Sequence, residues 1–139
     1  MLPAENSTLT GDLGELTFER HFLSQRCLIA RPRSDVFRVD YLLEWNGHIV
    51  KINVKTMSRQ MQGNGNTFTT TLTASKNGRR ATYIPTDIDY FGVVNLEYDR
   101  IWMVPLSATI GKTGLAWVPP DLRKRTKRTA FDWDKYQIK

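Results

Sequence analysis

The feature that most constrains this chain is a pair of apolar runs flanking Asn46-Gly47, within residues 36–57. Asn-Gly between two runs rich in Val, Ile, Leu and aromatic residues is the strongest short signal for a β-hairpin. A type I′ turn at this dipeptide sets the register of the two strands, and counting outward from it brings Asp40 opposite Asn53. The sequence therefore predicts an antiparallel hairpin with a defined pairing of residues.

Strand alternation divides this hairpin into an apolar face and a polar one. The apolar face is expected to be buried and holds Val39, Tyr41, Leu43, Val50, Ile52 and Val54. The opposite face gathers Asp40, Asn53 and Lys55, because directly opposed residues and residues two apart share a face. This grouping of a carboxylate, a carboxamide and an amine predicts a functional site. The alternative is a surface ion pair between Asp40 and Lys55.

Length and charge limit the class of protein. The 139 residues suffice for one domain with a hydrophobic core, and we expect a single domain over residues 1–139. The 20 basic against 14 acidic residues give a net charge of +6, which fits a polyanionic partner. Part of this excess lies in a basic C-terminal extension over about residues 119–139.

Cysteine usage and hydropathy indicate the compartment. A single cysteine, Cys27, excludes an intramolecular disulfide and a zinc site built from clustered cysteines. The apolar runs are far shorter than the roughly 20 residues that span a bilayer. We therefore expect a reducing, intracellular and cytoplasmic setting and no membrane partner.

The remaining pattern predicts the order of elements. We expect a helix over about residues 11–26 with Thr10 as its N-cap, and a third strand over 66–74 with a threonine-rich face. A basic turn at 75–80, a helical turn at 85–89 and a second hairpin from 90 to 106 follow. This order predicts an α/β or α+β domain, with a single mixed central sheet flanked by helices.

Two glutamates fall on the packing side of the predicted helix. Glu15 and Glu19 lie within the arc of its apolar residues, where a carboxylate is costly unless a cation or a metal accompanies it. One interpretation pairs them with Arg20, Arg26 or a strand lysine. The other makes Glu15 part of the site on the hairpin.

The polar face of the hairpin suits a hard cation. An aspartate beside a second oxygen ligand favours Mg²⁺, which prefers oxygen donors and keeps several waters. A lysine next to such a cation can position or help to deprotonate a water, and can offset charge that builds on a phosphate.

The spacing of Asp40, twelve intervening residues and Asn53-Val54-Lys55 resembles the PD-(D/E)XK nuclease superfamily. The core of that superfamily is a helix followed by a three-stranded meander. The meander carries first an acidic residue and then a three-residue segment, which is Glu, Gln or Asp, then any residue, then Lys. GDLGELTFERHFL resembles its first helix, with Glu15 at the recurring glutamate. SKNGRR, TDIDYFGVV and IWMVPL are similar to its group I intron-encoded homing endonucleases, so the resemblance covers about residues 11–106.

The resemblance implies a role for each site residue. Asp40 would be a metal ligand, Glu15 an auxiliary ligand, the Val54 carbonyl a further contact and Lys55 the group that positions water. The cofactor would be Mg²⁺ or another divalent cation, and the reaction hydrolysis of a DNA phosphodiester.

Asn53 departs from the family pattern, which has Glu, Asp or, in the intron-encoded branch, Gln at this position. Its amide is one methylene shorter than that of Gln, which places the oxygen about 1 Å further back. Displacement on that scale can cost on the order of 10²-fold in rate. We therefore expect a weakened or altered enzyme, with Asn53 still counted among the catalytic residues.

Three regions are candidates for holding DNA. One interpretation makes residues 58–73 a two-stranded ribbon that enters a major groove, where Arg suits guanine and Gln or Asn suits adenine. The residues expected to contact bases are Arg59, Gln60, Gln62, Asn64, Asn66, Thr69 and Thr71. Those expected to contact phosphates are Lys76, Arg79, Arg80, Arg123, Lys124, Arg125, Lys127 and Arg128. The alternative interpretation is a solvated loop and a solvated basic tail.

The sequence thus predicts a Mg²⁺-dependent, site-specific double-stranded DNA endonuclease of the intron-homing type, with no small-molecule substrate. A chain with one active centre needs a second copy for a double-strand break, so we expect a homodimer or a homotetramer. One alternative is a Holliday junction resolvase, which shares the core. The other is a nuclease-fold module that binds DNA or RNA without cleaving it, in which Asn53 marks a lost activity.

Overall fold

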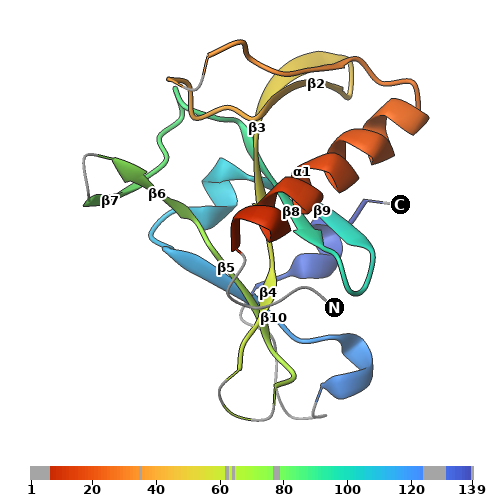
Figure 1. Cartoon of the computed structure of the whole chain (residues 1–139), viewed down its shortest axis with the longest axis vertical. Helices are drawn as coiled ribbons and strands as arrows, with labels where there is room; N and C mark the ends of the chain where they lie inside the picture. Colours follow the sequence, from red (N-terminus) through yellow and green to blue (C-terminus); the bar gives the residue numbers. More distant parts are fainter. Residues whose placement is uncertain are drawn as a thin grey trace.

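The structure, a computed structural model, is built around a five-stranded mixed sheet in the order β1-β2-β3-β8-β9 (Figure 1). It describes residues 7–34, 36–61, 63, 65–76, 79–123 and 131–138, with the side chains of 75, 76 and 79 outside that description. The strands are β1 Ile29–Ala30, β2 Tyr41–Trp45, β3 His48–Thr56, β8 Tyr90–Asn95 and β9 Arg100–Pro105. The β3–β8 pair is parallel and the other neighbours are antiparallel, which confirms a mixed central sheet in an α+β protein.

The β2–β3 hairpin has the predicted register. Its turn residues Asn46 and Gly47 have φ of 51° and 81°, the positive values that a type I′ turn requires. The ladder ends one pair earlier than expected, at Tyr41 and Ile52, so Asp40 lies just outside β2 rather than in a strand pair with Asn53. The Asp40 N–H still donates to the Ile52 carbonyl at 2.8 Å, so the residue stays beside β3.

One face of the sheet is covered by the helix α1 Ser7–Ser24. It starts before Gly11 and ends before Arg26, so the prediction of Thr10 as the N-cap was wrong, because Thr10 lies inside the helix. Phe18 and Phe22 are buried against the apolar face predicted for the hairpin, in a cluster with Tyr41, Leu43, Ile52, Val54, Val94, Ile101 and Met103. The helix packs mainly on β3 and β8, and Figure 1 shows it lying across them.

The other face of the central sheet is covered by a second, smaller sheet instead of a helix. This sheet has the order β10-β5-β4, from Gly114–Trp117, Phe68–Thr71 and Ser58–Arg59. Its apolar side chains meet those of β8 and β9 in a second core: Met57, Phe68, Leu72, Phe91, Val93, Trp102, Val104, Leu115, Trp117, Phe131 and Trp133. The C-terminal segment closes this core, since Trp133 Nε1 donates to the Ala116 carbonyl at 2.8 Å.

The expected third strand at 66–74 is divided in two. Its alternation is as predicted, because Phe68, Thr70 and Leu72 are buried, but pairing breaks at Leu72. The chain continues as β6 Thr73–Lys76, which pairs with β7 Arg79–Thr82 in a separate hairpin where a basic turn was expected. The expected helical turn at 85–89 is a tight turn, in which Asp87 Oδ2 accepts the Ile84 N–H at 2.9 Å.

The remaining helical elements are short 3₁₀ turns: Leu106–Thr109, Pro120–Leu122 and Trp133–Tyr136. Within the described part of the chain, no helix is both long and apolar enough to cross a membrane.

Candidate active site

Asp40 is fixed at the end of β2 by a bond to the neighbouring strand. Because β3 runs past the start of β2, the Val54 N–H has no strand partner on that side, and it donates to Asp40 Oδ2 at 2.7 Å. Burial raises the pKa of the Asp40 carboxyl, and the Val54 N–H, Lys55 and Arg31 partly oppose that effect. The structure gives the other carboxylate oxygen no hydrogen bond from a described residue.

Asn53 supplies a buried oxygen without a partner. The residue is 7% exposed, and its Nδ2 donates to the Arg38 carbonyl at 3.0 Å, which orients the amide. Its Oδ1 has no hydrogen-bond partner within the described residues. An unsatisfied buried acceptor costs about 1–3 kcal/mol, so a water or a ligand bound to this oxygen would stabilise the site.

Lys55 lies on the same strand, one residue beyond Val54. Its Nζ donates to Tyr83 Oη at 3.1 Å and to the Thr73 carbonyl at 3.4 Å. Burial lowers the pKa of the Lys55 amine and Asp40 opposes this, while Arg38 and Arg80 lower the pKa further. The amine is therefore held in place by two oxygens, and the charges of Asp40, Arg38 and Arg80 all act on it.

Glu15 lies near this group but is engaged by an arginine that the sequence did not indicate. Arg31 forms ion pairs with Glu15 at 3.4 Å and with Glu19 at 3.5 Å. The expected partners were Arg20, Arg26 or a strand lysine. Burial and then Asp40 raise the pKa of the Glu15 carboxyl, so the two acids influence each other. The described residues contain no group of three or more His, Cys, Asp and Glu side chains that could hold a metal.

Oxygen donors are nevertheless present for one hard cation. Asp40 and Asn53 each have an oxygen without a described partner, and the Val54 carbonyl points to the same strand edge as its N–H. Carboxylate, amide and carbonyl oxygens are the donors that Mg²⁺ accepts, with water completing its shell. The residues present therefore fit a divalent cation.

Sequence reasoning missed Arg31, Arg38 and Tyr83, which surround the site. Arg38 Nη1 donates to the Thr82 carbonyl at 3.0 Å and pairs with Asp87 at 3.4 Å. Burial, followed by the charge of Asp40, raises the pKa of Tyr83 to about 12, so this phenol keeps its proton at neutral pH. The arginine-rich loop at 31–38 was a usable signal, whereas nothing local marks Tyr83.

The ribbon residues expected to read bases have varied environments. Arg59 pairs with Glu97 at 2.6 Å, donates to the Gly65 carbonyl and lies over the Phe68 ring. Gln60 and Thr71 are exposed, and Asn66 and Thr69 are half-buried. Gln62 and Asn64 lie outside the described residues. Arg59 would thus have to leave an ion pair before it could contact a base.

The residues expected to contact phosphate fall in two places. Arg80 is exposed on β7, beside the site, and donates to Thr73 Oγ1 at 3.4 Å. Lys76 and Arg79 occupy the β6–β7 hairpin. Arg123 is half-buried and donates to the Val118 carbonyl, whereas the other expected tail residues lie outside the described range: Lys124, Arg125, Lys127 and Arg128.

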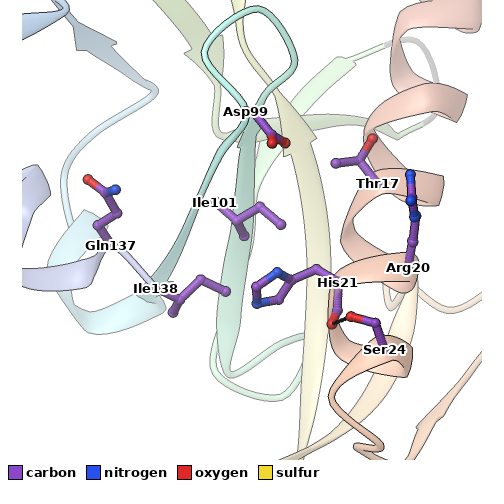
Figure 2. A pocket seen from close by; sticks show the side chains of 8 residues that line it. All are labelled: Thr17, Arg20, His21, Ser24, Asp99, Ile101, Gln137 and Ile138. Atoms are coloured by element: carbon purple, nitrogen blue, oxygen red, sulfur yellow. Dashed lines mark hydrogen bonds between the residues drawn. The ribbon is translucent and has the colours of Figure 1, made fainter.

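A separate groove of about 570 Å³ lies between the second half of α1, β9 and the C-terminal segment (Figure 2). Its lining is Thr17, Arg20, His21, Ser24, Asp99, Ile101, Gln137 and Ile138. None of the candidate catalytic residues lines it, so this groove does not contain the candidate active site.

The raised pKa of Asp40 predicts a trade-off between stability and function. The pKa of the Asp40 carboxyl is higher in the native state than in the unfolded state. The free energy of unfolding therefore falls as the pH rises from the unfolded pKa through the native pKa, and this loss persists at neutral pH. Asp40→Asn keeps an acceptor for the Val54 N–H, so it should raise the unfolding free energy at pH 7 by about 0.5–1 kcal/mol while abolishing cleavage. Thermal unfolding at pH 7 and below about pH 4 checks this, because the gain should vanish where wild-type Asp40 is protonated. A gain that is independent of pH would contradict the assignment to this carboxyl.

Comparisons with known proteins bear on the family and the fold of the chain. The sequence matches the PD-(D/E)XK endonucleases over residues 5–137. A search of curated proteins finds no match. Among solved structures, the chain is similar to the bacterial homing endonuclease I-Ssp6803I, with a TM-score of 0.77 and 20% sequence identity over 95% of this chain and 88% of that one.

Proposed function

This chain belongs to the PD-(D/E)XK endonuclease family, and we propose that it is a divalent-metal-dependent, site-specific endonuclease of double-stranded DNA of the intron-homing type. The observation that carries the proposal is the Asp40–Val54 hydrogen bond, which sets the acid beside the Asn53-Val54-Lys55 segment. The similarity in fold to a homing endonuclease supports the choice of branch. The proposed function also requires an intracellular location, where the protein has access to genomic DNA.

Asp40, Asn53 and the Val54 carbonyl would hold Mg²⁺, with Glu15 as an auxiliary ligand once it is released from Arg31. A bound divalent cation supplies charge neutralisation at the phosphate and a more acidic water. Hydrogen bonds already fix the Asp40 carboxylate and the Asn53 amide. Their oxygens would therefore meet the cation with little reorganisation of the protein.

Lys55 would position the attacking water and stabilise charge on the scissile phosphate. Its amine is oriented by Tyr83 and Thr73, and its lowered pKa makes the proton easier to give up than that of an exposed lysine. Arg38 and Arg80 act electrostatically on Lys55, so they are near enough to attract the phosphate backbone to this site.

Cleavage of both strands requires two such centres, so we propose that the chain acts as a homodimer or a pair of dimers on DNA. In the proposed DNA complex, the β4–β5 part of the second sheet and the segment that joins these strands supply base contacts from Gln60, Asn66, Thr69 and Thr71. The β6–β7 hairpin supplies phosphate contacts.

A plasmid-nicking assay tests the proposal directly. Mg²⁺ should convert supercoiled plasmid carrying a selected target to nicked and linear forms, and EDTA should prevent it. Preference for a four-way junction over linear duplex would indicate a junction resolvase instead. Binding without cleavage at any divalent-metal concentration would indicate a nuclease-fold binding protein and would contradict the proposal.

Asn53 offers a test of the shorter amide. Asn53→Gln should raise Mg²⁺-dependent cleavage by about 10-fold to 10²-fold, because the longer side chain advances the unpaired oxygen. Single-turnover cleavage rates measure this, with Gln25→Asn as a control, because Gln25 is an exposed amide just after the end of α1 and has no proposed contact with DNA. An unchanged rate would show that the reach of residue 53 does not limit the reaction.

A further inference from the structure

The outer face of α1 carries an exposed row of leucines. Leu9, Leu16 and Leu23 are 39%, 54% and 59% exposed and are spaced seven residues apart, so they form one stripe along about 21 Å of helix. At about 100° per residue, Leu16 lies on the opposite side of the helix from the buried Phe18. The chain thus presents a second apolar face on a helix that already covers its own core.

The charges beside this stripe are arranged with twofold symmetry about Leu16. Asp12 precedes Leu16 by four residues and Arg20 follows it by four, and both are exposed. Neither makes an ion pair within the described residues. When two copies of α1 lie antiparallel about Leu16, Leu9 meets Leu23 of the other copy, and Asp12 lies level with Arg20 of the other copy.

We propose that this leucine stripe is the contact between two copies of the chain, which pair through antiparallel α1 helices on a twofold axis at Leu16. The partner on this face is a second copy of the chain. The same helix carries both the apolar residues and the complementary charges that the pairing needs, as an interface between two identical surfaces requires. An unrelated partner would not explain the symmetry of Asp12 and Arg20. The inference does not depend on nuclease activity.

The size of the contact sets the expected strength. One pair of 18-residue helices covers less than the roughly 800 Å² per partner of a standard interface, so a dissociation constant in the micromolar range is expected. Binding of both copies to one DNA duplex would raise their local concentration and favour the pair.

Sedimentation of the full chain between about 1 and 100 µM tests the proposal. Wild type should pass from monomer to dimer, and Leu16→Glu, which sets two carboxylates against each other on the axis, should stay monomeric with unchanged circular dichroism. Ile110→Glu is the matched control, because Ile110 is also an exposed apolar residue and lies outside α1. A monomeric wild type, or a Leu16→Glu protein that dimerises like wild type, would overturn the proposal.

A charge exchange tests the register independently. Asp12→Arg alone and Arg20→Asp alone should each weaken the dimer by about 5-fold to 10-fold, and the double exchange should restore it. Two weak single variants with no recovery in the double variant would overturn the antiparallel register.

Discussion

Lys55→Ala should lower Mg²⁺-dependent cleavage by at least about 10³-fold while leaving DNA binding within a few-fold of wild type. The loss follows from the position of the amine, which Tyr83 and Thr73 orient and on which the charge of Asp40 acts. The fold should tolerate the change, because burial lowers the pKa of Lys55 and so disfavours the charged form in the native state.

Cleavage and binding are measured separately, the first as a single-turnover rate and the second as a shift in mobility with Ca²⁺ in place of Mg²⁺. Lys51→Ala is the matched control, since Lys51 lies on the same strand and donates to the Thr86 carbonyl, outside the group around Asp40. Retention of wild-type cleavage by Lys55→Ala would exclude this lysine from the reaction. A variant that fails to fold would assign Lys55 a structural role, and Lys55→Met, which keeps the packing of the stem, would then show whether cleavage is lost independently.

Gly14→Ala should destabilise the protein by about 3 kcal/mol or more. A Cβ at Gly14 would lie only 1.8 Å from Thr56 Oγ1 and 2.9 Å from Thr56 Cβ, so α1 would have to move away from β3. That movement would also displace Phe18, which packs against the sheet from the next turn of the helix.

Gly11 provides the control within the same helix, because a Cβ there meets nothing within 4 Å. Gly11→Ala should stabilise the protein by about 0.5–1 kcal/mol through helix propensity. Urea unfolding of both variants measures the difference, and Thr56→Ala should recover part of the loss in a double variant with Gly14→Ala. Similar stabilities for the two alanine variants would mean that the close approach of α1 and β3 does not limit the packing.

The β2–β3 hairpin was largely predictable from local sequence patterns. The Asn46-Gly47 turn and the alternation of the flanking runs predicted the register and the buried face, because turn geometry and strand period are properties of neighbouring residues. The end of the ladder at Tyr41 was not predictable in this way. It depends on the chain leaving β2 at Asp40, whose side chain takes over the Val54 N–H.

The contacts around the candidate site were not predictable from local sequence patterns. The residues of the Asp40, Asn53 and Lys55 group were predicted from spacing, and their roles in catalysis remain a prediction. Arg31 reaches Glu15 across 16 positions and Tyr83 reaches Lys55 across 28, and no period or turn signal links residues so far apart.

What the sequence determined by itself was therefore the mixed α+β character of the chain, the hairpin and the residues on its polar face, since each follows from turn chemistry and two-residue alternation. Only the tertiary structure decided that a second sheet, not a helix, covers the other face of the central sheet, and that Arg31 and Tyr83 hold Glu15 and Lys55. These contacts depend on which apolar surfaces bury each other when segments far apart in the sequence come together. The pattern of neighbouring residues therefore does not predict them.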